Sequence, residues 1–295
     1  MQSSLEQFIE HAKEHTVIPV WKELVADLIT PVSAFERIVG DQPGFLLESV
    51  EHGERWSRWS FIGRNPLLTI KKIDSQLLIE GEIPIEFDVN GEILESVRAL
   101  QRTLSAPQIE KFPPMYSGLL GYLGYDTVRE IEDLPTPAND DLLIPDSILS
   151  VIGEVAAFDH WSQRVFLIAN AIVKPQSSES EIAESYYETK NRLDSLMLDG
   201  AKPLSEPLLD PPNLNTNSVE VKSTMSENDY CGIVEKAKDY ILAGDIFQVV
   251  LSQRFDFDLE ANPFDVYRVL RQINPSPYMY FVKNEEVTLV GCSPE

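Results

Sequence analysis

Short apolar segments, several with alternating polar positions and most bounded by glycine, proline or polar residues, dominate the chain up to residue 173. This pattern is typical of β-strands with at least one face buried. The segment 31–39, which follows Thr30, is also predicted to be extended. The predicted strands are 17–21, two strands within 44–66, 67–72, 76–80, 118–126, and two long strands within 149–173.

Fewer segments show the spacing of three to four residues that an amphipathic helix requires. In 93–104, apolar residues at positions 93, 97, 100 and 104 fall on one helical face. Helices are predicted there and at 1–16, 179–198 and 225–243, and the segment 262–273 is amphipathic. Many strands with few helices, followed by a mixture of both, indicate the α+β class.

Residues 199–224 are rich in proline, glycine and asparagine, and such a composition does not hold regular structure. We therefore predict an inter-domain linker at 199–224. It would join an N-terminal domain, 1–198, to a second domain that begins at 225 and runs to 295.

The most informative stretch of the second domain is 246–257, which alternates as a half-buried strand does. Gln248 then shares one face with Ser252 and Arg254, while apolar residues at 247, 249 and 251 take the other. Burying a polar group without a partner costs roughly 1–3 kcal/mol. We therefore expect these polar side chains to face a ligand, water or a polar network.

The composition narrows the choice of partners. The 295 residues carry a net charge of −24, which repels phosphate backbones and anionic lipid and so argues against nucleic-acid and membrane-surface roles. A site for an anionic metabolite must therefore be locally basic. The chain has two cysteines, Cys231 and Cys292, which suggests a reducing compartment. It shows no N-terminal signal and no apolar run of about 20 residues. We therefore predict a cytoplasmic protein.

Six short strings stand out as recognisable motifs along the chain. They are FLLES (45–49), WSFIG (59–63), GLLGYLGYD (118–126), GDIFQVVLSQRF (244–255), NPSPYM (274–279) and GCSPE (291–295). Together they closely resemble the large subunit of anthranilate synthase, a chorismate-binding enzyme. Their order and spacing make the resemblance specific, and it covers nearly the whole chain. It implies a layered sandwich of largely antiparallel sheets with helices outside.

Two residues receive catalytic roles from this resemblance. Glu295, in the SPE triplet, corresponds to the general acid that protonates the leaving C4 hydroxyl of chorismate, which requires a raised pKa. Gln248 stands where water-adding relatives carry a lysine base, so the sequence resembles an ammonia-adding member. On the residues alone, a surface glutamate after a strand and an amide satisfying strand backbone remain alternatives.

The resemblance also implies a feedback site for L-tryptophan, formed jointly by LLES and NPSPYM. A carboxylate and a hydroxyl suit the ammonium group of a free amino acid, and Leu47 and Met279 offer an apolar wall for the indole. Alternatively, LLES is an ordinary buried strand with a stray glutamate. The predicted tryptophan-binding residues are Leu47, Glu48, Ser49, Pro277, Tyr278 and Met279.

The implied reaction joins chorismate and ammonia to give 2-amino-2-deoxyisochorismate, which loses pyruvate to yield anthranilate, the first step of tryptophan biosynthesis. Mg²⁺ is the implied cofactor, with ligands expected beyond residue 295, so no metal ligand is predicted within this chain and we expect it to be catalytically incomplete. Ammonia would come from a separate glutamine amidotransferase subunit in a heterotetramer, because neither cysteine lies in a nucleophile motif. An aminodeoxychorismate synthase and a non-catalytic tryptophan-binding fragment remain alternatives.

Overall fold

A computed structural model describes most of the chain, as two compact units. The larger unit is Met1–Leu208 together with Val266–Glu295, and the smaller is Leu209–Asp265. The described residues are 2–50, 58–73, 76–81, 91–135, 140–204, 210–211 and 219–294.

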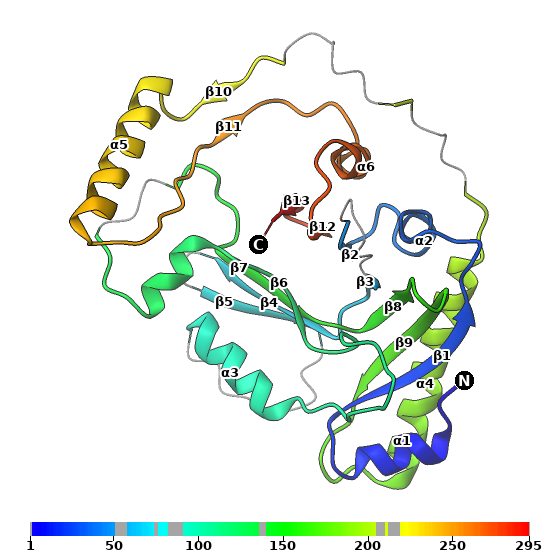
Figure 1. The fold of residues 1–295 in the computed structure, drawn as a ribbon. Helices are drawn as coiled ribbons and strands as arrows, with labels where there is room; N and C mark the ends of the chain where they lie inside the picture. Colours follow the sequence, from blue (N-terminus) through cyan, green and yellow to red (C-terminus); the bar gives the residue numbers. More distant parts are fainter. Residues whose placement is uncertain are drawn as a thin grey trace. The chain divides into compact units, whose positions relative to one another are not determined.

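The larger unit contains a seven-stranded antiparallel sheet with strand order β1-β9-β8-β3-β2-β12-β13 (Figure 1). Strands from the two ends of the chain share this sheet, since β2 pairs with β12. The strands are β1 (Val17–Val25), β2 (Gly44–Glu48), β3 (Trp59–Arg64), β8 (Glu154–Asp159), β9 (Arg164–Ile172), β12 (Tyr278–Lys283) and β13 (Thr288–Ser293).

This pairing changes the predicted division of the chain. The predicted second domain, 225–295, is not one unit, because backbone hydrogen bonds hold β12 and β13 in the sheet of the N-terminal strands. The first two residues of the predicted linker, 199–224, are still helical, because the preceding helix runs to Gly200. Its residues 205–209 and 212–218 lie outside the described part of the chain.

A second, four-stranded antiparallel sheet has the order β5-β4-β7-β6. Between β7 and β8 the chain passes from this sheet to the larger one at Gly153. The first of the two long strands predicted within 149–173, from 149 to 160, is therefore divided into two strands. A side chain at Gly153 would place its Cβ 1.8 Å from the carbonyl oxygen of Asn65, which only glycine avoids. The strands are β4 (Leu68–Ile73), β5 (Gln76–Gly81), β6 (Leu119–Leu123) and β7 (Ser147–Val151).

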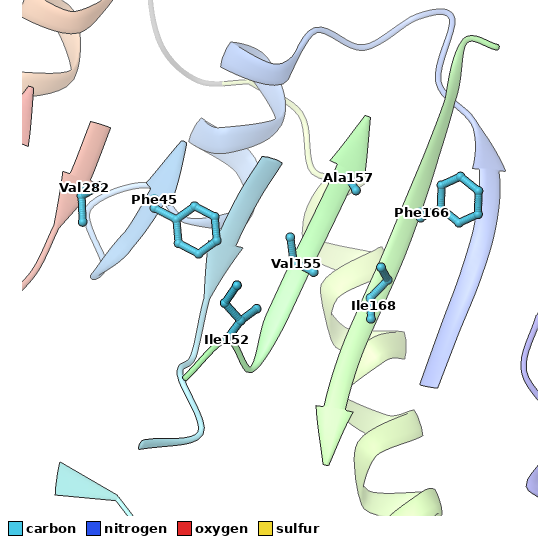
Figure 2. Packing of buried hydrophobic residues seen from close by; sticks show 7 residues of the cluster. All are labelled: Phe45, Ile152, Val155, Ala157, Phe166, Ile168 and Val282. Carbon is cyan, nitrogen blue, oxygen red and sulfur yellow. The ribbon is translucent and has the colours of Figure 1, made fainter. Parts of the chain in front are cut away.

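The main core covers one face of the seven-stranded sheet (Figure 2). Side chains on β2, β8, β9 and β12 point to this face, and Leu120 of β6 packs against them from the smaller sheet. The two sheets therefore share this core, as a sandwich requires. The buried members are Phe45, Ile152, Val155, Ala157, Phe166, Ile168 and Val282.

Helices cover the outer faces. On the large sheet α4 packs against β9, and Phe35 of α2 contacts Phe281 of β12 with ring centroids 5.2 Å apart. On the small sheet, Ile93 and Leu100 of α3 pack against β4 and β7. These layers confirm the predicted α+β sandwich. The helices are α1 (Leu5–Ala12), α2 (Pro31–Ile38), α3 (Ile93–Thr103), the 3₁₀-helix η1 (Tyr125–Glu130) and α4 (Glu179–Gly200).

Helix α2 corrects the extended segment predicted at 31–39. Thr30 and Ser33 form a reciprocal capping box, and Pro31 takes the first helical position. A proline there loses no hydrogen bond and already has a helical φ. The proline therefore starts the helix and does not break it.

The smaller unit contains α5 (Glu227–Ala243) and a two-residue strand pair, β10 (Lys222–Ser223) with β11 (Phe255–Asp256). Helix α6 (Pro263–Ile273) begins in this unit and ends in the larger one. Ser226 caps α5, as expected of a polar residue at that position. None of the helices in the described part of the chain is long and apolar enough to cross a membrane.

The strand predicted at 246–257 is absent except at Phe255–Asp256. A strand needs a neighbour to accept and donate its backbone hydrogen bonds. Within the described residues, β10 alone pairs with this stretch, and it is two residues long. The alternating pattern is present, but the described part of the chain pairs it only over these two residues.

Candidate functional site

Strands β2 and β12 bring the two predicted tryptophan-site segments together. In their antiparallel register Met279 lies opposite Glu48, and Tyr280 lies opposite Leu47. Beyond the strands, the backbone N–H of Val50 donates to the carbonyl oxygen of Ser276 across 2.9 Å. The LLES and NPSPYM segments are thus neighbours in space, as the resemblance implied.

The register also decides which face each side chain takes. Directly opposed residues share a face, and successive residues alternate. Glu48 and Met279 therefore point to the helix-covered face, whereas Leu47 packs against the core on the other face. This corrects the predicted apolar wall, because Leu47 and Met279 do not line one side together.

Ser49, Pro277 and Tyr278 lie where β2 ends and β12 begins. Ser49 comes directly after β2, and the same register continued by one residue places it beside Tyr278. Ser49 and Pro277 are half-buried, while the Tyr278 side chain is largely exposed. A hydroxyl, strand-end carbonyls and an accessible aromatic ring are suitable contacts for a free aromatic amino acid.

Glu48 itself is buried, with 7% of its surface exposed. The hydroxyl of Tyr267 donates to Glu48 Oε2 across 2.7 Å, and Arg271 Nε lies 2.8 Å from the same oxygen. Burial raises the pKa of Tyr267 far above its ordinary value, and the charge of Glu48 adds to this shift. The Tyr267 hydroxyl therefore stays protonated and acts as a donor.

Tyr267 and Arg271 are not among the site residues predicted from the sequence. Both belong to α6, and their spacing of four residues places them on the same helical face. The available signal was an arginine one turn after a tyrosine on the apolar side of an amphipathic segment. A cation there needs a carboxylate partner, which the LLES glutamate provides.

Further polar groups surround this end of the sheet on β3 and β8. Ser60 lies opposite Glu48 in the register, and its Oγ is 2.8 Å from Nε2 of His160. Burial lowers the pKa of His160, although the charges of Glu48 and Asp159 oppose this shift. The imidazole is thus neutral at pH 7.

Arg58 adds a second cation in this region. Its Nε and Nη2 donate to the two carboxylate oxygens of Asp159 at 3.1 and 2.9 Å. Its guanidinium lies over the rings of Trp59 and Trp161, 4.9 and 5.1 Å from their centroids. Arg271 and Arg58 are thus each paired with a buried carboxylate, Glu48 and Asp159 respectively.

The described structure does not test the predicted catalytic pair, Gln248 and Glu295. Gln248 lies exposed in the irregular stretch of the smaller unit, and Glu295 lies outside the described residues. Their shared role stays a prediction. Within the described residues, no cluster of three or more histidine, cysteine or acidic side chains has an arrangement that fits a metal ion.

Comparison with known proteins identifies the family. Residues 44–295 match the model of the chorismate binding enzyme family. The chain belongs to this family. Its predicted relation to anthranilate synthase is confirmed as homology to the N-terminal part of component 1 of that enzyme.

Similar chorismate-binding enzymes include anthranilate synthase component 1 of Acetivibrio thermocellus, 37% identical over 287 residues that cover 96% of this chain and 57% of that protein. The same component of Arthrobacter globiformis is 38% identical over 299 residues, covering 99% and 56%. The crystal structure of anthranilate synthase component I from Streptococcus pneumoniae TIGR4 matches with a TM-score of 0.62 and 27% identity, over 92% of this chain and 57% of that one. The chain spans little more than half the length of these relatives.

Proposed function

We propose that this chain belongs to the large subunit of an anthranilate synthase, which makes anthranilate and pyruvate from chorismate and ammonia and is inhibited by L-tryptophan. The pairing of β2 with β12 carries the proposal, because it joins LLES to NPSPYM at one end of the sheet. The names of the similar proteins, anthranilate synthase component 1, support the same activity.

The tryptophan site in this proposal lies at the meeting of β2 with the segment before β12. Ser49 and strand-end carbonyls accept hydrogen bonds from the ammonium group, and Pro277 and Tyr278 contact the indole. Met279 supports these contacts from the helix-covered face, and Leu47 supports them from the core face. An inhibitor at this position stabilises one arrangement of the protein, by typically 1–3 kcal/mol of coupling.

In the proposed chemistry, Glu295 donates the proton to the departing C4 hydroxyl, and Gln248 takes the place of a base. An amide cannot usefully deprotonate water, whereas ammonia is already a competent nucleophile. Nitrogen is therefore added to the ring, and oxygen is not. Mg²⁺ is the cofactor that the resemblance implies, and we assign no ligand for it among the residues of this chain.

The partner in this proposal is a glutaminase subunit that supplies ammonia. The relatives are named as component 1, which is consistent with a second component. Both cysteines, Cys231 and Cys292, are free thiols, and neither lies in a nucleophile motif of the sequence. Ammonium salts should therefore replace the partner in an assay.

The experiment uses the intact gene product with chorismate, Mg²⁺ and ammonium chloride, followed by anthranilate fluorescence. We expect product formation that L-tryptophan suppresses. Formation of an amino product that retains its pyruvyl group would favour the aminodeoxychorismate alternative. Tryptophan binding without any turnover would favour the non-catalytic module.

A second experiment tests the choice of nucleophile. Gln248→Lys should lower ammonia incorporation and allow a hydroxylated product, because a lysine can act as a base toward water. Glu295→Gln should abolish turnover by removing the proton donor. Unchanged product and unchanged ammonia dependence in Gln248→Lys would remove the role assigned to this residue.

A further inference from the structure

The Glu48 carboxylate lies against α6. Its side chain is 3% exposed, and Tyr267, which donates to it, is completely buried. Both donors, Tyr267 and Arg271, come from this single helix. The carboxylate therefore joins the central strand β2 to α6.

The carboxylate has few acceptor positions left. Oε2 receives the Tyr267 hydroxyl at 2.7 Å and has Arg271 Nε at 2.8 Å, while Oε1 accepts from Arg271 Nη2 at 3.3 Å. A carboxylate offers about four acceptor positions in all. A ligand beside Ser49 meets the half-buried Ser49 hydroxyl more readily than it meets this buried carboxylate.

Helix α6 also leads directly into the NPSPYM segment, 274–279. It ends at Ile273, and the backbone N–H of Asn274 still donates to Leu270 across 2.9 Å. The residues that follow, 275–279, run directly into β12. Holding α6 against Glu48 therefore fixes the position of the NPSPYM segment relative to β2.

We propose that Tyr267 and Arg271 are positioning residues for the amino-acid site, acting through Glu48. They hold the end of β2 and the segment before β12 in the spacing that binds tryptophan. This inference rests on the proposed function, and it assigns Glu48 a supporting role beneath the site. Helix α6 begins within the unit that carries Gln248, so it is one of the two covalent connections between that unit and the site.

The test measures L-tryptophan binding by calorimetry on the intact gene product, with no catalysis required. Tyr267→Phe removes a single hydroxyl and should weaken binding on the order of tenfold, within the usual range of coupling between sites. Arg271→Gln should weaken it similarly, and Arg271→Lys should recover part of the loss because it keeps the charge. Tyr187→Phe, at an exposed tyrosine of α4, is the matched control and should bind as the wild type does.

A double variant separates positioning from a general loss of stability. In the Glu48→Gln background, Tyr267→Phe should have little further effect on binding, because its partner is already altered. Fully additive losses, or wild-type affinity in both Tyr267→Phe and Arg271→Gln, would overturn the inference. Failure of the wild-type protein to bind tryptophan would overturn the proposed regulatory site as well, so the two failures are distinguishable.

Discussion

Replacing Arg64 with methionine should destabilise the larger unit strongly. Arg64 is the last residue of β3, and its side chain is 13% exposed. Its Nε lies 2.9 Å from Glu154 Oε2, and its Nη1 lies 2.7 Å from Asp199 Oδ2 and 2.6 Å from the carbonyl oxygen of Ile38. One guanidinium therefore joins β3, β8 and the C-terminal ends of α2 and α4.

The magnitude follows from what Arg64→Met leaves behind. Glu154 is 2% exposed, and its remaining side-chain donor is Asn65 Nδ2 at 3.1 Å. Removing one partner of a buried ion pair costs about 3–5 kcal/mol, since the other charge stays buried. For a unit of this size the melting temperature should fall by about 6–20 °C.

The assay is thermal and urea unfolding followed by circular dichroism. Arg98→Met is the matched control, since Arg98 also pairs with a carboxylate, that of Glu95, but both side chains are exposed, 58% and 45%. Exposed pairs contribute about 0–1 kcal/mol. The double variant Arg64→Met with Glu154→Gln should regain part of the loss. A decrease in Arg64→Met no larger than that in Arg98→Met would refute the reasoning.

Three further outcomes follow from the contacts described. Burial alone would raise the pKa of Glu130, but Lys72 and two backbone N–H groups of α3 lower this pKa from the ordinary 4.5. The ionised Glu130 carboxylate therefore contributes to stability above pH 4.5, and this contribution is lost on acidification. Glu130→Gln should therefore flatten the acid-unfolding curve. Gly153→Ala should destabilise by about 1–3 kcal/mol or more because its Cβ meets Asn65, whereas an alanine at an open helical glycine such as 232 should not. Ser49→Phe should abolish tryptophan binding in calorimetry while urea unfolding stays close to wild type, and unchanged affinity would contradict the site.

Much of the fold is predictable from local pattern. The strands at 67–72 and 76–80 correspond to β4 and β5, and the helix at 93–104 corresponds to α3. These elements are amphipathic, and the face that the pattern marks as apolar is the face that packs. The helix predicted at 179–198 also matches α4, whose start is fixed by the Ser178 capping box.

The predictions of secondary structure are wrong where a local sequence signal fits two structures, or where the segment's packing partner is distant in the sequence. Pro31 can break a helix or begin one, and the decisive contact was the capping bond between Thr30 and Ser33. The apolar run through Gly153 is continuous in sequence but divides between two sheets, because the glycine passes close to Asn65. No local pattern distinguishes these cases.

The site was predicted in part for the same reason. Recognising LLES and NPSPYM was sufficient to expect that they meet, and β2 and β12 do pair. The faces of Leu47 and Met279 depend on the register, which is set by pairing across more than 200 residues. The ion pair of Glu48 with Arg271 depends on the same long-range pairing and was therefore missed.

The position of β2 between β3 and β12 has a consequence for synthesis of the protein. Its partner β12 is made more than 200 residues later, which takes roughly ten seconds or more at ribosomal speed. During that interval the side of β2 that later pairs with β12 has no partner strand, and a strand of a neighbouring nascent chain can pair with it. Until Arg271 is made, Glu48 places an unpaired carboxylate on that edge. Inward-facing charges of this kind oppose edge-to-edge aggregation.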